Sequence, residues 1–221
     1  MKEFKEKQTP AIKSTIIVCF ILLFLVVIAG LVLLLKADNG LEAALKENNV
    51  MLFDAPRNVP AVSLRRHDGT VFTTEQFNGH WNLINFGYTY CPDICPTNMA
   101  DMKIAYNQLV EAGLADQINF WMITVDPQRD TEQQLSLYVP FFHPDFVGLT
   151  GDPEQIATLA TQLSAVYYRE GEGEGYTVAH SDNYAIIDPD GEFIALMRPP
   201  HKPDHIVTVL TQLIDNSDSI N

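Results

Sequence analysis

The stretch that decides the fold is WNLINFGYTYCPDICP, residues 81–96. Its first part, Trp81 to Phe86, is a short apolar run that stops at Gly87, which is typical of a core strand. Cys91 and Cys95 follow directly, and residues four apart in a helix lie on one face with Cβ atoms about 5–6 Å apart. The stretch therefore predicts two sulfurs close enough to share one ion or to form one disulfide.

The position of the two cysteines, at a strand end and a helix start, indicates reactive sulfur. Unpaired N–H groups and the helix dipole favour thiolate there, so we expect a lowered thiol pKa. Redox thioredoxin motifs normally have two residues between the cysteines, and this chain has three, a spacing that suits a bridging ion better without forbidding a disulfide. Two thiolates favour copper(I), whereas structural zinc wants four protein ligands, so zinc is the weaker expectation.

The sequence after the cysteines alternates between helices and strands. Apolar spacing and turn residues predict the following elements: a helix from Met99 to Gly113, a strand Ile118–Val125, a helix Thr131–Tyr138, a strand Val147–Thr150, a helix from Pro153, a hairpin of Tyr184–Ile187 and Glu192–Met197, and a helix near Pro203. Strand, helix and strand followed by a hairpin and a closing helix predict an α/β protein with a thioredoxin-like fold.

The sequence before residue 81 predicts an extra N-terminal β-hairpin, with Ala61–Leu64 and Val71–Thr73 as its strands around Gly69. Further upstream, Ser14 to Leu35 is uncharged and almost wholly apolar, and at about 1.5 Å per residue it spans the roughly 30 Å hydrocarbon layer of a bilayer. It is longer than the apolar core of a cleaved signal peptide, about 7–15 residues, so we expect an uncleaved transmembrane helix.

Lysines set the expected orientation of this helix. Lys2, Lys5, Lys7 and Lys13 precede it and only Lys36 follows closely, so the N-terminus is expected in the cytoplasm. We therefore expect a single-pass protein of the inner (cytoplasmic) membrane whose soluble domain is on the exported, periplasmic side, where thiols can be oxidised. The expected division is a cytoplasmic N-terminus 1–13, an anchor 14–35, a tether 36–57, a thioredoxin-like copper-binding domain 58–215 and a tail 216–221. The tether is expected to be extended or a short helix.

The net charge narrows the class of partner. The chain has 28 Asp+Glu against 14 Lys+Arg, a formal charge of −14. An acidic surface repels phosphate, so nucleic acid is not expected as a partner. A cation or a basic protein is permitted, and solubility alone also explains the acidity.

Among six histidines, His180 differs from the rest. It follows the mobile-looking run Glu170–Gly175 and precedes a predicted core hairpin. The other histidines are expected in surface or structural roles: His67, His80, His143, His201 and His205.

Other chemistry-bearing residues have simpler interpretations. Asp126 and Asp130 could suggest acid–base work, but at a strand-to-helix turn such residues are mostly caps. Met99 and Met102 could be soft ligands, yet at helical spacing methionines are more often core. The tract around Glu172 and Glu174 is expected to be a solvated loop, with partner docking as the minority hypothesis.

Four motifs together resemble the Sco/SenC family. They are Tyr90–Thr97 (YCPDICPT), Val125–Thr131 (VDPQRDT), Gly148–Gly151 (GLTG) and Val178–Ser181 (VAHS), in this order and spacing. The resemblance covers about residues 58–213. It implies a membrane-anchored, thioredoxin-fold copper protein that assists assembly of the binuclear copper centre of cytochrome c oxidase.

The same resemblance implies the site. Cys91, Cys95 and His180 match the family's three ligands for Cu(I) or Cu(II). Tyr90 stands where relatives often have His, which excludes a fourth ligand there, and Ala179 stands where many have an acidic residue. The implied partners are the copper-accepting subunit of a terminal oxidase and, as secondary partners, another copper chaperone or a thiol reductase.

Two alternatives to a copper metallochaperone remain open. The first is a thiol–disulfide oxidoreductase that reduces the cysteines of the copper-accepting partner, with Cys91 and Cys95 as its redox pair. The second, a peroxide-consuming enzyme of the same fold, is weaker because no Thr-x-x-Cys arrangement precedes the pair. We expect no other enzymatic activity.

Overall fold

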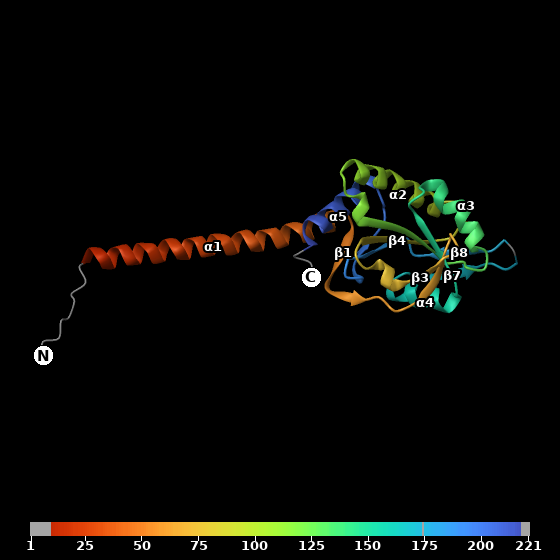
Figure 1. Ribbon diagram of the computed structural model, residues 1–221, viewed down its shortest axis with the longest axis horizontal. Coiled ribbons are helices and arrows are strands. Elements are labelled where there is room, and N and C mark those ends of the chain that lie inside the picture. The colour runs from red at the N-terminus through yellow and green to blue at the C-terminus, as the bar shows by residue number, and fades with distance from the viewer. Residues whose placement is uncertain (1–9, 174, 218–221) are drawn as a thin grey trace. The chain divides into compact units, whose positions relative to one another are not determined.

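The computed structural model describes residues 10–173 and 175–217. The chain divides into two compact units, Met1–Ala43 and Ala44–Asn221. Helix α1 (Pro10–Glu47) supplies most of the first unit, and within it Ser14–Val32 is long and apolar enough to cross a membrane (Figure 1). None of the side chains from 14 to 32 is buried. The lysines 2, 5 and 7, on which the predicted orientation depends, lie outside the described residues, as do Glu174 and residues 218–221 of the predicted tail.

The second unit is built on a mixed eight-stranded sheet. Its strands, in spatial order, are β1 (Val50–Asn58), β10 (Glu192–Met197), β9 (Tyr184–Ile187), β4 (Trp81–Gly87), β5 (Ile118–Thr124), β6 (Val147–Thr150), β2 (Ser63–Arg66) and β3 (Val71–Thr73). The central strand β4 pairs parallel with β5 and antiparallel with β9. All its residues are buried, which explains why its sequence is a continuous apolar run broken only by asparagines.

Helices cover both faces of this sheet (Figure 1). They are α2 (Ile94–Glu111), α3 (Glu132–Phe142), α4 (Pro153–Gln162) and α5 (Pro203–Asp215), with short 3-10 helices η1 (Thr74–Phe77) and η2 (Ala115–Gln117). Helices α2 and α5 pack on each other above the sheet, and α4 lies below it (Figure 1). The arrangement is the predicted α/β architecture, with α2 starting beyond the end of the central strand.

Side chains alternate along the central strand to form two cores. Ile84 and Phe86 point to the α4 side, where they join Trp121 and Leu159 in one buried apolar cluster. The methionines 99 and 102 of α2 are fully buried on the other side, as their core interpretation predicted. Buried apolar layers on both faces hold the end of β4 rigidly, and that end carries the cysteine loop.

The predicted strands and helices are found, but three strands were missed. Strand β1 occupies residues predicted as a tether: it pairs antiparallel with β10, and Phe53 packs edge-on against Phe193 with ring centroids 4.8 Å apart. The pairing register shifts between Leu52 and Arg57. Residues 38–57 are thus the end of α1 followed by a sheet strand, because β10 would otherwise be an exposed sheet edge.

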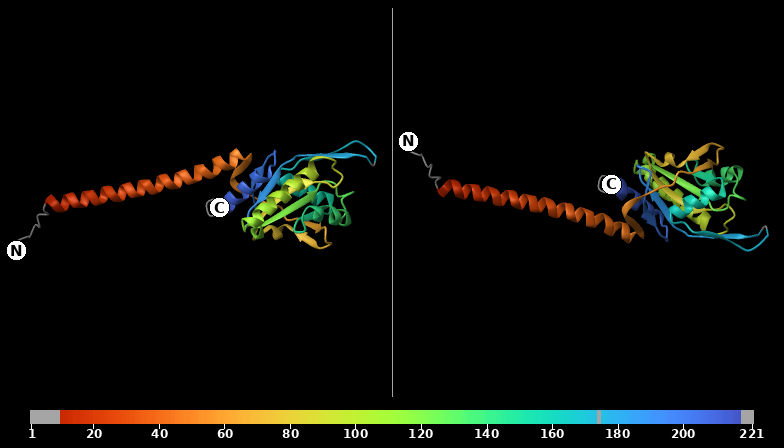
Figure 2. Two further views of the ribbon diagram at one scale, coloured as in Figure 1. Left: turned by 90° about the horizontal axis from the view of Figure 1, so that it is seen from above. Right: turned by 90° about the horizontal axis from the view of Figure 1, so that it is seen from below.

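The other two missed strands form a separate hairpin. Strands β7 (Tyr167–Glu170) and β8 (Thr177–His180) pair antiparallel with each other in a two-stranded sheet. Figure 2 shows this light-blue hairpin reaching past the neighbouring elements. Between them, Gly171 and Gly173 adopt positive φ angles of 88° and 72°, a conformation that favours glycine. The run predicted as a mobile loop is therefore the turn of the hairpin that ends in His180.

Candidate metal centre

The cysteine loop links the end of β4 to the first turn of α2. Cys91 lies in the loop and is half-buried, whereas Cys95 lies in the helix and has no exposed surface. Gly87 makes room for it, because a Cβ atom at position 87 would lie 3.1 Å from Cys95 Sγ. The glycine that ends the strand thus defines the space in which the second sulfur sits.

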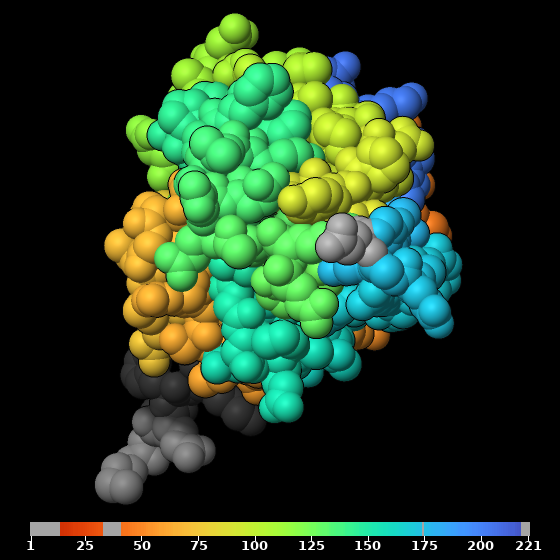
Figure 3. Space-filling model, turned by 90° about the vertical axis from the view of Figure 1, so that its right-hand side faces the viewer, coloured from red at the N-terminus to blue at the C-terminus, as the bar shows by residue number. Residues whose placement is uncertain are grey.

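Two sulfur atoms and one imidazole nitrogen converge at this loop. The Sγ atoms of Cys91 and Cys95 and a ring nitrogen of His180 all lie within 4.8 Å of one another. The Cys95 N–H group donates to Cys91 Sγ over 3.5 Å, and Cys95 Sγ lies 3.3 Å from His180 Nε2. Figure 3 shows, on one face, the yellow segment that contains the cysteine loop beside the blue hairpin. The structure therefore brings together all three predicted site residues.

The histidine ring is oriented by its neighbours. His180 Nδ1 lies 3.1 Å from the Ser181 carbonyl oxygen, which can only accept, so Nδ1 carries the proton and Nε2 keeps its lone pair toward the sulfurs. The Tyr88 ring packs edge-on against the imidazole at 6.1 Å, and its hydroxyl accepts the Val178 N–H group. Sequence reasoning missed both partners; because position 179 is alanine and not an acidic residue, the acceptor for His180 Nδ1 is the Ser181 carbonyl.

The predicted lowering of the thiol pKa is wrong for Cys95. Burial raises the pKa of this thiol above its ordinary value, because the thiolate loses water, and the nearby Cys91 side chain adds to the effect. The neutral Cys95 thiol therefore donates its S–H to His180 Nε2. A bound cation would replace that proton and offset the cost of burying the thiolate.

The donor set and its size fit copper. Zinc–sulfur and zinc–imidazole bonds are about 2.3 Å and 2.0–2.1 Å, so donors on an ion of this size are at most about 4.6 Å apart and a small side-chain rotation is enough. Two thiolates and one imidazole are the ligands that soft copper favours, and a four-ligand zinc site would need another donor. Within the described residues no other His, Cys, Asp or Glu group clusters in this way.

Asp126 and Asp130 do not cap the following helix as predicted. Thr131 caps α3, its side chain accepting the Gln134 N–H. The Asp130 carboxylate is buried and accepts from the N–H and hydroxyl of Thr89 and from the Thr124 hydroxyl. Burial raises the pKa of Asp130. Asp126 binds Arg129 in its own loop and the Tyr176 hydroxyl, and Asp130 fixes the loop two residues before Cys91.

The remaining histidines have structural surroundings. His201 is buried, stacks on Tyr184 with centroids 3.8 Å apart, and donates from Nε2 to the Asp182 carbonyl. His67 Nδ1 accepts the Gly148 N–H. These contacts agree with the structural roles expected from the sequence.

Comparison with known proteins identifies relatives of this arrangement. The family model described as SCO1/SenC matches residues 54–215. A Stutzerimonas stutzeri protein to which copper binding is provisionally ascribed is 39% identical over 176 residues, which are 79% of this chain and 86% of that protein. The mitochondrial SCO1 homolog 1 of Arabidopsis thaliana is 37% identical over 145 residues, 65% of this chain. The chain spans 43% to 50% of the length of the mitochondrial relatives it matches.

A solved structure extends the comparison to three dimensions. The crystal structure of Arabidopsis thaliana ScoI with copper bound has a TM-score of 0.66 and 33% identity, covering 71% of this chain and 98% of that one. The thioredoxin-like fold predicted from the sequence is confirmed by this neighbour.

Proposed function

The chain belongs to the SCO1/SenC family of copper-binding proteins, and we propose that it is a membrane-anchored copper metallochaperone that assists assembly of the binuclear copper centre of cytochrome c oxidase. Copper is its cargo, and Cys91, Cys95 and His180 are its ligands. The acceptor is the copper-binding subunit of a terminal oxidase.

The observation that carries the proposal is the convergence of two sulfurs and one imidazole within 4.8 Å. The cysteines share one segment, and His180 comes from a strand 85 residues beyond Cys95. Their environment also favours exchange, because only Cys95 is fully buried. An acceptor thiolate can approach copper from the Cys91 side while His180 withdraws with its hairpin.

The anchor supports the proposed location. The apolar helix segment Ser14–Val32 would hold the copper domain at the inner membrane, facing the periplasm. Protease added to spheroplasts should then digest the chain beyond residue 44 and spare a tag at the N-terminus. Digestion of the tag would contradict the proposed orientation.

Copper stoichiometry tests the metal site. The reduced protein should bind one copper per chain and prefer it to zinc. Cys91→Ser and Cys95→Ser should each remove most of this copper, because a single thiolate with one imidazole is a poor Cu(I) site. Full copper retention by both variants at low free metal would contradict the ligand assignment.

A second candidate, thiol–disulfide oxidoreductase, is favoured by the unequal exposure of the two cysteines. Half-buried Cys91 can attack a partner disulfide as the thiolate, forming a mixed disulfide and releasing one partner sulfur as a thiol. Cys95 then displaces the second partner sulfur, which takes up a proton. The products are a Cys91–Cys95 disulfide and a reduced partner able to take copper.

His180→Ala separates the two candidates. Copper binding should weaken markedly, Cu(II) most, because Cu(II) favours imidazole, whereas the rate of disulfide exchange should change much less. Unchanged copper affinity with impaired exchange would make reductase the primary function.

A further inference from the structure

The hairpin that carries His180 has little support from the main sheet. Its strands β7 and β8 pair with each other, and neither belongs to the eight-stranded sheet. One backbone group of the hairpin, the Val178 N–H, donates to the body of the domain at the Tyr88 hydroxyl. Side-chain contacts must therefore hold His180 over the cysteines.

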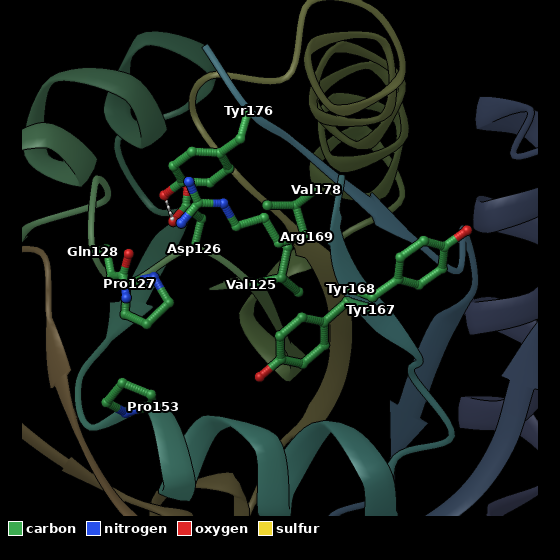
Figure 4. A pocket seen from close by; sticks show the side chains of 10 residues that line it. All are labelled: Val125, Asp126, Pro127, Gln128, Pro153, Tyr167, Tyr168, Arg169, Tyr176 and Val178. Atoms are coloured by element: carbon green, nitrogen blue, oxygen red, sulfur yellow. Dashed lines mark hydrogen bonds between the residues drawn. The ribbon is translucent and has the colours of Figure 1, made fainter. Parts of the chain in front are cut away.

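Tyr176, directly before β8, supplies the most extensive of these contacts. Only 8% of Tyr176 is exposed, and its hydroxyl donates to Asp126 Oδ1 over 2.7 Å (Figure 4). Arg129 binds the same carboxylate through Nε and donates from Nη1 to the Tyr176 carbonyl over 3.0 Å. We call Tyr176, Asp126 and Arg129 the tyrosine clamp.

Stacking adds to these hydrogen bonds. The guanidinium groups of Arg129 and Arg169 lie 3.6 Å and 3.8 Å from the centre of the Tyr176 ring. Figure 4 shows the Arg169 guanidinium lying against this ring. Because Asp126 is only 4% exposed, its charge needs Arg129 and the hydroxyl, which makes the docked position of Tyr176 strongly preferred.

A cavity lies against the base of the hairpin. It has a volume of about 200 Å³ and lies beside the clamp, and its walls include Pro127, Pro153 and Tyr167 (Figure 4). Tyr168, the next residue, is 59% exposed. Val178 and Tyr167 pack against the apolar core next to this cavity, and the clamp adds polar contacts to that apolar attachment.

The clamp also touches the cysteine loop. The Arg129 guanidinium lies 4.8 Å from the ring centre of Tyr90, the residue before Cys91. Arg129 thus contacts both chain segments that bring ligands, and Tyr176 directly precedes the strand β8 that ends in His180. A shift of Tyr176 would carry His180 with it.

From these contacts we infer that Tyr176 and Arg129 are positioning residues that set how often His180 reaches the copper held by Cys91 and Cys95. The inference rests on the proposed function and names a part of its mechanism. With the clamp closed the site has three ligands; with the clamp open it has two thiolates. The apparent copper affinity is the affinity of the closed state multiplied by the fraction of molecules that are closed. Cu(II) affinity responds most because Cu(II) depends on the imidazole.

The test uses the full chain in detergent micelles, loaded with Cu(II) or Cu(I). The variants are Tyr176→Phe, which removes one hydrogen bond, and Tyr176→Ala, with Tyr168→Ala as the matched control on the same hairpin. We expect Tyr176→Ala to lower Cu(II) affinity about tenfold and Tyr176→Phe about threefold, with a weaker nitrogen coupling in the electron paramagnetic resonance spectrum. Tyr168→Ala should match the wild type.

A second set in the His180→Ala background identifies the route. There Tyr176→Ala should cost no further copper affinity, since the ligand it positions is gone. Equal losses with and without His180 would overturn the inference, as would a normal nitrogen signal and affinity in Tyr176→Ala. Thermal unfolding of the metal-free variants identifies loss of folding, and Tyr176→Phe, which keeps the ring, provides the test if Tyr176→Ala is unfolded.

Different results would contradict the proposed copper site and the tyrosine clamp. A wild-type chain that binds no copper, or binds it equally well without His180, contradicts the proposed site and the clamp together. A chain that needs His180 but is indifferent to Tyr176 contradicts the clamp alone.

Discussion

At the scale of single residues, the site depends on where space and protons are available. Gly87 leaves room for a sulfur, and the buried Cys95 thiol keeps its proton until a cation replaces it. Both features act on Cys95 Sγ, in opposite directions. The sulfur needs an exact position, yet its charged form is unfavourable unless copper is present.

Gly87→Ala should weaken copper binding and destabilise the fold. The added Cβ would lie 3.1 Å from Cys95 Sγ and 3.6 Å from the Met122 terminal carbon, so the sulfur must move. Overpacking of this kind costs about 1–3 kcal/mol. Urea unfolding and Cu(I) competition measure both effects; Gly30→Ala in α1, with open space around it, is the control. Wild-type copper affinity in Gly87→Ala would show that the sulfur position is not critical.

Copper affinity should rise with pH. The pKa of Cys95 is raised by burial, so the metal-free site holds a proton at neutral pH that copper must displace. Each displaced proton makes affinity rise about tenfold per pH unit until the pH passes the thiol pKa. Competition with a Cu(I) chelator between pH 6 and 8 measures the slope, which should fall in Cys95→Ser. An identical slope in that variant would place the released proton elsewhere.

The residue scale also shows what the sequence could reveal of the site. The cysteine spacing, the motifs and the isolated His180 pointed to the three donors that the structure brings together. The Ser181 carbonyl and the clamp were beyond reach, because a backbone acceptor has no sequence signal and Tyr176 meets Asp126 only through tertiary folding. The thiol pKa was misjudged because the helix start indicates a dipole, whereas burial depends on the whole core.

At the scale of elements, strands and helices with a clear apolar pattern or turn signal were predicted, including the short strands β6 and β9, whereas β1, β7 and β8 were missed. Helix α2 and strands β4 and β5 have apolar patterns that their own sequence specifies. Strands β7 and β8 are four residues each, separated by a Glu- and Gly-rich turn, and neither alternates clearly. Strand β1 contains Pro56 and a register shift, and only its pairing with β10 makes it a strand.

Removal of β1 should destabilise the copper domain. A chain that begins at Val59 loses the pairing with β10 and the buried side chains Leu45 and Val50. Each such side chain contributes about 1.5–3 kcal/mol, so the loss should be roughly 3 kcal/mol or more compared with a chain that begins at Leu41. Urea unfolding of the two chains measures it. Equal stability would mean that β1 is dispensable and that the domain starts at 58, as first predicted.

At the scale of the whole molecule, three properties combine into one proposed role. The chain has an apolar helix able to span a membrane, a formal net charge of −14, and two sulfurs and an imidazole gathered at one site. A carrier tethered at the membrane stays near membrane-embedded acceptors, where tethering raises effective concentration. The acidity also suits a basic face on the acceptor.

Loss of the protein should lower the copper content of a terminal oxidase without lowering the amount of its subunits. The physical reason is that delivery, not synthesis, is interrupted. Metal analysis and immunoblotting of a deletion strain under copper-limited growth measure this, and the Cys91→Ser protein provides the control for the metal site. A fully metallated oxidase in the deletion strain would leave the reductase role or another acceptor.

The sheet order has a consequence for when the site comes into being. The central strand β4 carries the cysteine loop but is flanked by β5 and β9, and β9 lies beyond His180 in the chain. During synthesis of the polypeptide, its two thiols therefore precede both the imidazole and the strand β9 that flanks β4. Non-local pairing of this kind is slow to form. We therefore expect copper to be acquired by folded molecules rather than by nascent ones. A copper-loaded molecule is then one whose fold is complete.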